Sequence, residues 1–172
     1  MSRPNAVTFK GTPLTLAGEA LKAGQPAPDF TIHYFEGGLK TITPADLKGK
    51  ATILSVVPSL DTPVCATQTK KFNDQLAALG DKINAVTISL DLPFAMNRFC
   101  GAESIKNMRV GSDYQNRNFG QNYGFLIEEL KLLARGVVIL DKDGKVVYAE
   151  TVPEVVNEPN YDKALEALKS AL

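Results

Sequence analysis

The residues with the greatest chemical potential in this sequence are two cysteines, Cys65 and Cys100, and a single histidine, His33. Three such side chains are too few for a closed four-ligand zinc site of Cys and His. Two cysteines are also too few for the disulfide-dense scaffold of small secreted domains. The sulfurs are therefore buried thiols, a structural disulfide or the reacting atoms of redox chemistry, and their number alone does not choose among these.

Cys65 follows a turn that is typical of a helix start, Pro58-Ser-Leu-Asp-Thr62-Pro-Val-Cys65. Thr62 is suited to cap a helix and Pro63 to occupy its first position. Cys65 then lies in the first turn, near unpaired N–H groups and the positive end of the helix dipole, where cysteines become reactive thiolates. The Thr62 hydroxyl can face a molecule docked beside the sulfur, and Pro58, which has no N–H, would shield a thiolate. A buried cysteine that acts as a small hydrophobe fits this position equally well.

A thioredoxin-type reductase needs a second cysteine three residues after the first. That position is occupied by Gln68, so this mechanism is excluded. Cys100, 35 positions after Cys65, is the nearest partner.

Composition excludes several other classes of function. The chain has 172 residues, 44% of them hydrophobic, with 19 basic and 19 acidic side chains and no net charge. Nucleic-acid binding domains usually show a basic excess, so we expect no nucleic-acid partner. No apolar run reaches the ~18 residues of a membrane span, and residues 1–10 lack the apolar stretch of a signal peptide. We expect one domain over residues 1–172, located in the cytoplasm and away from membranes.

The hydrophobic pattern predicts an α/β fold of the thioredoxin-like type, in which helices flank a mixed central sheet. An N-terminal β-hairpin, turning at Gly11-Thr12, is expected as an extension over residues 7–17. Strands follow at 30–35, 51–57, 83–90, about Val110, 136–140 and 145–149, the last two joined by an Asp-Lys-Asp-Gly hairpin turn. Helices are expected from Pro63 to Gly80, from Asp91 and Pro93 to Gly101, at 116–123 and at 161–172.

Other polar and apolar clusters suggest structural roles. His33 lies on a predicted strand, Phe94 and Met96 are expected in the core, and Glu128-Glu129 is expected on a solvated helix face. No glycine-rich phosphate loop is present, and we expect neither a cofactor nor a metal.

Several segments together resemble the bacterial thiol peroxidases, an atypical two-cysteine branch of the peroxiredoxins. They run from the hairpin to the last helix: Phe9–Leu14, Pro58–Cys65, Asp91–Phe94, Arg98-Phe-Cys-Gly-Ala-Glu103, Leu133-Ala-Arg135 and Glu158–Asp162. The Pro-x-x-x-Thr-x-x-Cys motif marks peroxiredoxins in general, whereas the segment around Cys100 points to this branch. Gly136 departs mildly from the pattern, because alanine is expected there.

The resemblance implies a thiol-specific peroxidase that reduces hydrogen peroxide and organic hydroperoxides in antioxidant defence. It assigns Cys65 as the peroxidatic cysteine, with Thr62, Arg135 and the Cys65 N–H as donors to the leaving oxygen. Without the resemblance, Arg135 is better interpreted as a solvated charge at a strand entrance. Cys100 is implied to be the resolving cysteine, so that a Cys65–Cys100 disulfide forms and thioredoxin reduces it.

Two further expectations follow from this mechanism. Because both sulfurs are predicted on helices, disulfide formation should require local unfolding around each of them. Members of this branch are typically homodimers, and Pro58–Thr62 with the aromatic segment 114–125 would form that surface here.

Two alternatives stay open at this point. The same disulfide would also serve a redox-sensing or interaction module, which would react slowly with peroxide and bind a partner in one redox state only. A thioredoxin-like domain with inert thiols would form no disulfide with peroxide at all.

Overall fold

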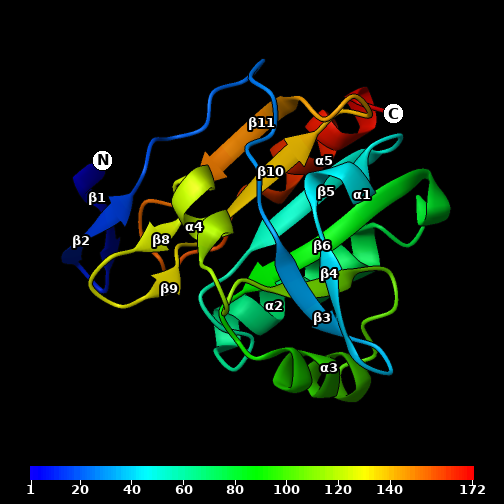
Figure 1. Ribbon diagram of the computed structural model, residues 1–172, viewed down its shortest axis with the longest axis horizontal. Helices are drawn as coiled ribbons and strands as arrows, with labels where there is room; N and C mark the ends of the chain where they lie inside the picture. Colours follow the sequence, from blue (N-terminus) through cyan, green and yellow to red (C-terminus); the bar gives the residue numbers. More distant parts are fainter.

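A seven-stranded mixed sheet forms the centre of the computed structural model, which describes residues 1–172 (Figure 1). Its strand order is β11-β10-β5-β6-β7-β3-β4. The parallel pairs are β5–β6 and β6–β7, and the remaining neighbours are antiparallel. The strand bounds are β3 (Ile32–Phe35), β4 (Leu39–Ile42), β5 (Ala51–Val56), β6 (Ile83–Ser89), β7 (Arg109–Ser112), β10 (Gly136–Leu140) and β11 (Val146–Thr151).

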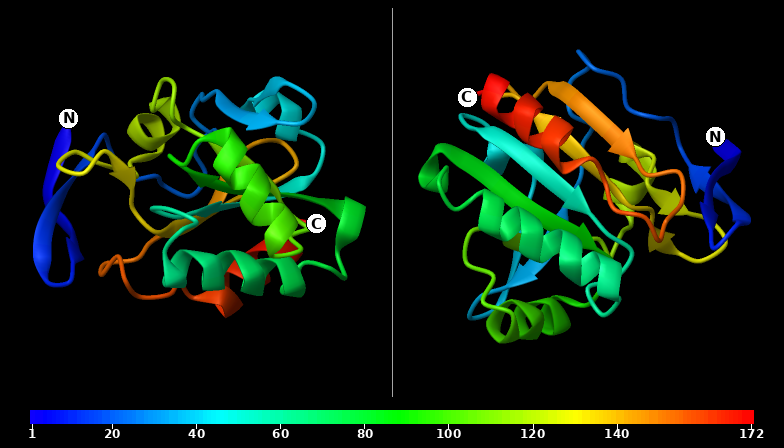
Figure 2. Two further views of the ribbon diagram at one scale, coloured as in Figure 1. Left: turned by 90° about the horizontal axis from the view of Figure 1, so that it is seen from below. Right: turned by 180° about the vertical axis from the view of Figure 1, so that it is seen from behind.

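The helices cover both faces of this sheet. Their bounds are α1 (Pro44–Leu47), α2 (Pro63–Gln75), α3 (Pro93–Ala102), α4 (Asn118–Tyr123) and α5 (Tyr161–Ser170), with a 3₁₀ turn, η1 (Gly80–Lys82). The view from behind shows α2 and α5 side by side on one face (Figure 2). Helix α4 lies on the other face, and α3 packs against β3 and β7. None of the helices combines the length and apolar character needed to cross a membrane.

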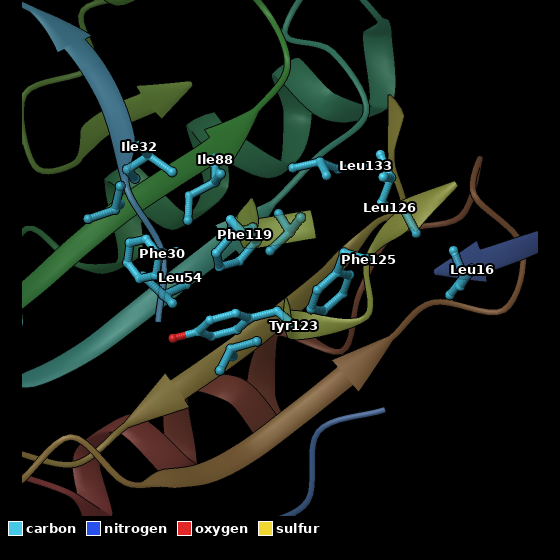
Figure 3. Packing of buried hydrophobic residues seen from close by; sticks show 14 of the residues in the cluster. Leu16, Phe30, Ile32, Leu54, Ile88, Phe119, Tyr123, Phe125, Leu126 and Leu133 are labelled. Atoms are coloured by element: carbon cyan, nitrogen blue, oxygen red, sulfur yellow. The ribbon is translucent and has the colours of Figure 1, made fainter. Parts of the chain in front are cut away.

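The central strand β5 separates two hydrophobic cores because its side chains alternate between the faces. Leu54 and Val56 belong to the cluster under α4, whereas Ile53 packs with the helices α2 and α5 on the opposite face. Every residue of β5 is buried, as the apolar sequence of this strand predicts. Aromatic rings from Phe30, Phe119, Tyr123 and Phe125 fill the first cluster (Figure 3).

The N-terminal hairpin belongs to a separate four-stranded sheet, ordered β1-β2-β8-β9. Its strands are β1 (Ser2–Phe9), β2 (Thr12–Ala17), β8 (Leu126–Ile127) and β9 (Leu132–Leu133). The hairpin turn is Lys10-Gly11, one residue earlier than predicted, and both residues have positive φ, 49° and 84°. Two-residue hairpin loops with this conformation match the twist of the flanking strands.

Four local expectations were wrong. Helix α2 ends at Gln75, and Gly80 begins the 3₁₀ turn instead of closing the helix. Gly101 lies inside α3 instead of stopping it. Phe94 is 55% exposed, while Met96 is buried as predicted. The Glu128-Glu129 pair lies in the β8–β9 turn rather than on a helix, and both carboxylates bind the N-terminal hairpin, at Ser2 and Thr15.

Several elements were not predicted, among them the second strand of the β3–β4 hairpin, helix α1 and the short strands β8 and β9. These elements are two to four residues long, so they carry little periodicity. His33 is half-buried on β3 with its ring 5.8 Å from that of Tyr114.

Asp113 is a buried carboxyl that holds the start of α4. It accepts hydrogen bonds from the N–H groups of Phe119 (3.0 Å) and Gly120 (2.8 Å). Burial nevertheless raises its pKa to about 6, although these hydrogen bonds and the charge of Arg117 oppose the shift. The folded protein therefore favours the neutral carboxyl more strongly than the unfolded chain does.

This raised pKa predicts a pH dependence of stability that Asp113→Asn removes. The contribution of the neutral carboxyl is fully present below the ordinary pKa of 3.8 and is lost as the pH rises through about 6. The unfolding free energy of the wild-type protein relative to Asp113→Asn should fall over that range by on the order of 2 kcal/mol. Urea titrations of both proteins at several pH values measure this difference, and a flat difference would contradict the prediction.

Candidate active site

The predicted helix start places Cys65 in the first turn of α2. Thr62 is the N-cap residue with extended backbone, and Pro63 occupies the first helical position, as the sequence predicts. The Thr62 side chain makes no capping hydrogen bond, because its hydroxyl instead donates to the carbonyl of Ser59 at 2.9 Å. The N–H of Cys65 has no acceptor within the protein, which leaves an available donor next to its sulfur.

Cys65 is fully buried in a small cluster with Val57, Leu60 and Met96. Two of these neighbours come from the segment before α2, and Met96 comes from α3, the helix that carries Cys100. Pro58 is also buried and begins the loop over the first turn. Cys65 is therefore covered by two segments that are far apart in the sequence, residues 57–60 and helix α3.

Arg135 reaches the sulfur from the residue before β10. Its Nη2 lies 3.2 Å from Cys65 Sγ, and the residue is only 2% exposed. The interpretation of Arg135 as a solvated charge is therefore wrong. A buried guanidinium is costly unless every side of it is hydrogen-bonded or paired with a negative charge.

The other two contacts of the guanidinium are neutral acceptors. Nη1 donates to Gln68 Oε1 at 3.0 Å, and Nε donates to the carbonyl of Val155 at 2.7 Å. The ion pairs of the fold, Lys70–Glu103 and Lys71–Glu158, do not involve Arg135. No carboxylate lies within ion-pair distance of this buried cation, and Cys65 Sγ is one of its three hydrogen-bond partners.

Gln68 is a site residue that sequence reasoning missed. It was used only to exclude a Cys-x-x-Cys motif, but it is buried and its amide group also donates to Ser55 Oγ at 2.8 Å. The position three residues after Cys65 was the available signal, since it lies on the same helix face as the sulfur. Ser55, on the central strand β5, thereby orients the amide that binds Arg135.

Gly136, the mild departure from the family pattern, lies against this network. Its carbonyl is 3.5 Å from the Gln68 amide nitrogen. A Cβ at this position would overlap the carbonyl oxygen of Glu150 and the ring of Phe125. Glycine thus allows β11 and Phe125 to pack closely beside Arg135.

Cys100 lies on α3 and is half-buried, and both cysteines are free thiols in this structure. Burial raises the pKa of the Cys100 thiol to about 11, so this sulfur stays protonated at neutral pH. The two cysteines therefore differ in chemistry: one is paired with a buried cation, and the other is held as a neutral thiol.

Asp91 joins the two cysteine-bearing segments. It was expected to open helix α3, but Leu92 is the N-cap and the Asp91 carboxylate is used differently. It accepts hydrogen bonds from Ser59 Oγ (2.7 Å), the N–H of Leu60 (2.8 Å) and Ser89 Oγ (2.6 Å). The loop before Cys65 is thus fixed on the segment that leads into the helix of Cys100.

Comparisons with known proteins agree with this fold. The sequence model of the Redoxin family matches residues 22–165. The thiol peroxidase of Bacillus subtilis is 52% identical over 95% of this chain and 96% of its own, and that of Staphylococcus aureus is 46% identical over 95% and 98%. A peroxiredoxin-like protein from Aquifex aeolicus has a similar crystal structure, with a TM-score of 0.89 and 40% identity over 98% of each chain.

The chain therefore belongs to the redoxin family, among its thiol peroxidases. A thiol peroxidase from Chromobacterium violaceum, only 16% identical, shares the fold with a TM-score of 0.84 over 95% of each chain. The predicted thioredoxin-like fold with an N-terminal hairpin is confirmed.

The amide of Gln68 provides a test of how Arg135 is held. Gln68→Leu keeps the volume but leaves Nη1 of Arg135 and Oγ of Ser55 without partners. We expect the unfolding free energy to fall by ~1–3 kcal/mol, the cost of unsatisfied buried polar groups. Urea denaturation of the reduced protein measures the change.

Thr69→Val is the matched control for this substitution. Thr69 is the next buried residue of α2, and its hydroxyl donates only to the backbone carbonyl of Cys65, at 3.0 Å. Removing that hydroxyl should cost less than about 1 kcal/mol, because the carbonyl keeps its helical hydrogen bond. Equal losses in the two variants would mean that Gln68 has no special role.

Proposed function

We propose that this chain reduces hydroperoxides with Cys65 as the peroxidatic cysteine. The observation that carries the proposal is the contact of Cys65 Sγ with the buried Arg135 guanidinium, which has no carboxylate partner. The Cys65 thiolate attacks one oxygen of the O–O bond, which gives Cys65 sulfenic acid and an alkoxide or hydroxide. A proton then converts this leaving group to an alcohol or to water.

Negative charge develops on the leaving oxygen during this attack, so donors placed there accelerate the reaction. The unpaired N–H of Cys65 and the guanidinium of Arg135 are the two such donors nearest the sulfur. The resemblance assigns Thr62 as a donor to the leaving oxygen, but its hydroxyl proton is directed to Ser59. Thr62 therefore offers lone pairs instead and would accept a hydrogen bond from the peroxide. Pro58 offers no competing N–H above the first turn.

We propose that Cys100 resolves the sulfenic acid. The protonated Cys100 thiol condenses with Cys65 sulfenic acid, a disulfide forms and water leaves. A dithiol donor, for which we propose thioredoxin, then reduces the disulfide by thiol–disulfide exchange and becomes oxidised itself. This cycle requires a compartment that keeps thiols reduced, such as the cytoplasm expected from the sequence.

A peroxidase assay with the two single-cysteine variants tests these roles. Cys65→Ser should abolish consumption of hydrogen peroxide and of an alkyl hydroperoxide. Cys100→Ser should consume about one equivalent of peroxide per chain and then stop, because no disulfide is available for thioredoxin. Stopped-flow mixing and coupled thioredoxin oxidation measure both quantities.

The outcomes separate this proposal from the alternatives. Full turnover by Cys65→Ser would refute the assignment of Cys65. Slow oxidation of Cys65 by stoichiometric peroxide would favour a redox-sensing module, and the absence of a peroxide-induced disulfide would favour inert thiols.

Formation of the disulfide should loosen both cysteine segments. Cys65 is enclosed by Leu60 and Met96, and the two helices hold the sulfurs as separate thiols. We therefore expect faster amide exchange after oxidation in peptides that cover residues 58–70 and 92–104. Peptides of the buried strand β5 are the control and should not change. Equal exchange in the reduced and oxidised proteins over both segments would contradict this expectation.

We propose that the protein is a homodimer, and its expected surface, Pro58–Thr62 with residues 114–125, stays a prediction. In the second segment Tyr114 is half-buried and residues 115–117 are exposed. Phe119, Tyr123 and Phe125 of the 114–125 segment are buried in the core rather than available to a partner. Two of the exposed apolar side chains lie at the start of α3, where Leu92 is 52% exposed and Phe94 55%. This surface adjoins the Pro58–Thr62 loop through Asp91, and exposed apolar patches often mark protein contacts.

A further inference from the structure

The N-terminal hairpin, residues 2–17, lies outside the part of the chain that matches the Redoxin family. It nevertheless pairs with the segment after β11. The N–H of Thr8 donates to the carbonyl of Pro153 at 2.8 Å, and the N–H of Val155 donates to the carbonyl of Thr8 at 2.8 Å. Thr8 and Glu154 thus form a parallel bridge between the hairpin and residues 153–155.

The same segment supplies the shortest contact of the Arg135 guanidinium. The carbonyl of Val155 accepts from Nε at 2.7 Å, while Val155 itself is only 1% exposed. Val155 is therefore fixed on both sides, by the hairpin through its N–H and by Arg135 through its carbonyl. In addition, the carbonyl of Arg135 accepts from the N–H of Val152 at 2.9 Å. A continuous set of hydrogen bonds runs from the hairpin to the cation at Cys65.

The carboxylate of Glu154 holds this junction together. It accepts hydrogen bonds from Thr8 Oγ1 (3.0 Å) and from both residues of the hairpin turn, Gly11 N–H (2.9 Å) and Lys10 N–H (3.1 Å). It also accepts from the N–H of Val156 at 3.2 Å. One side chain therefore binds the hairpin turn, the strand β1 and its own backbone segment.

A second carboxylate binds the same hairpin from a turn that makes no hydrogen bond to the Arg135 side chain. Glu129, in the β8–β9 turn, accepts from the N–H of Thr15 on β2 at 2.9 Å through each of its oxygens. The β8–β9 turn does not pair with residues 153–155, and none of the hydrogen bonds of the Arg135 guanidinium goes to it. Loss of either carboxylate would weaken the hold on the hairpin, but of the two only Glu154 lies on the segment whose Val155 carbonyl accepts from the guanidinium.

We propose that Glu154 is a positioning residue for the peroxidase reaction. It fixes the hairpin on residues 153–155, so that the Val155 carbonyl holds Arg135 against Cys65 Sγ. This inference rests on the proposed function, in which Arg135 activates the sulfur and stabilises the leaving oxygen. It gives the hairpin, an extension of the common family fold, a part in the chemistry of Cys65.

The test compares Glu154→Gln with Glu129→Gln, each in the full chain with Cys100→Ser so that only one thiol reacts. Each substitution removes one carboxylate that binds the hairpin. Two rates are measured as functions of pH: alkylation of Cys65 by iodoacetamide, and its single oxidation by hydrogen peroxide. Thermal unfolding of each variant reports the loss of stability separately.

We expect Glu154→Gln to move the acid side of both pH profiles to higher pH. At a fixed pH on that side, both rates should fall about three- to tenfold, because one unit of displacement is a tenfold change in thiolate. The peroxide reaction should fall further than alkylation, since a displaced guanidinium also stabilises the leaving oxygen less. Glu129→Gln should keep both profiles within about twofold of the parent, whatever stability it loses.

Unchanged profiles in Glu154→Gln, or equal displacement in both variants, would overturn the proposal. If Glu154→Gln does not fold, Thr8→Val removes only the hydroxyl contact to the same carboxylate. It should then displace the alkylation profile in the same direction by a smaller amount, and an unchanged profile would overturn the proposal. Alkylation does not depend on peroxide chemistry. A parent protein that is alkylated but not oxidised by peroxide would therefore refute the proposed function without deciding the role of Glu154.

Discussion

The contact between the Arg135 guanidinium and Cys65 Sγ is the interaction on which the rest of the site depends. A cation that is 2% exposed and has no carboxylate partner must be held by a complete set of acceptors. The protein supplies three acceptors from two places: the sulfur and the Gln68 amide on α2, and the Val155 carbonyl after β11. The hydrogen bonds that compensate for the burial of Arg135 also hold its guanidinium against Cys65 Sγ.

The opposite side of the site is organised around Asp91. Its carboxylate fixes the loop before Cys65, while Met96, one turn before Cys100 on α3, lies in the same buried cluster as Cys65. The two cysteine segments are therefore held by shared contacts in the dithiol state. The Arg135 side of the site is built on the strands β5 and β10, whereas on the other side one carboxylate holds a loop. This difference suits a reaction whose second step must bring the two cysteines together.

Sequence reasoning succeeded where residues within one element determine the outcome. The continuous apolar run of β5, the Thr62-Pro63 helix start and the Asp141–Gly144 hairpin turn are all present as predicted. It failed where a side chain binds a segment that is distant in the sequence. Asp91 binds the Ser59 loop instead of opening α3, and Glu128 and Glu129 bind the N-terminal hairpin instead of lining a helix. Phe94 was expected in the core for its apolar character, but position in the fold leaves it exposed.

The sequence by itself determined which atoms could react. Two cysteines, one of them in a first helical turn after Pro58 and Thr62, are local facts of composition and spacing, and helix-start chemistry acts over a few residues. Only the tertiary structure decided that the solvated-charge interpretation of Arg135 is wrong, that Gln68 and Val155 hold it, and that Cys100 is a neutral, half-buried thiol. Burial and charge pairing arise between residues about 70 positions apart in the chain. The electrostatic state of the site is therefore a property of the packed fold rather than of any motif.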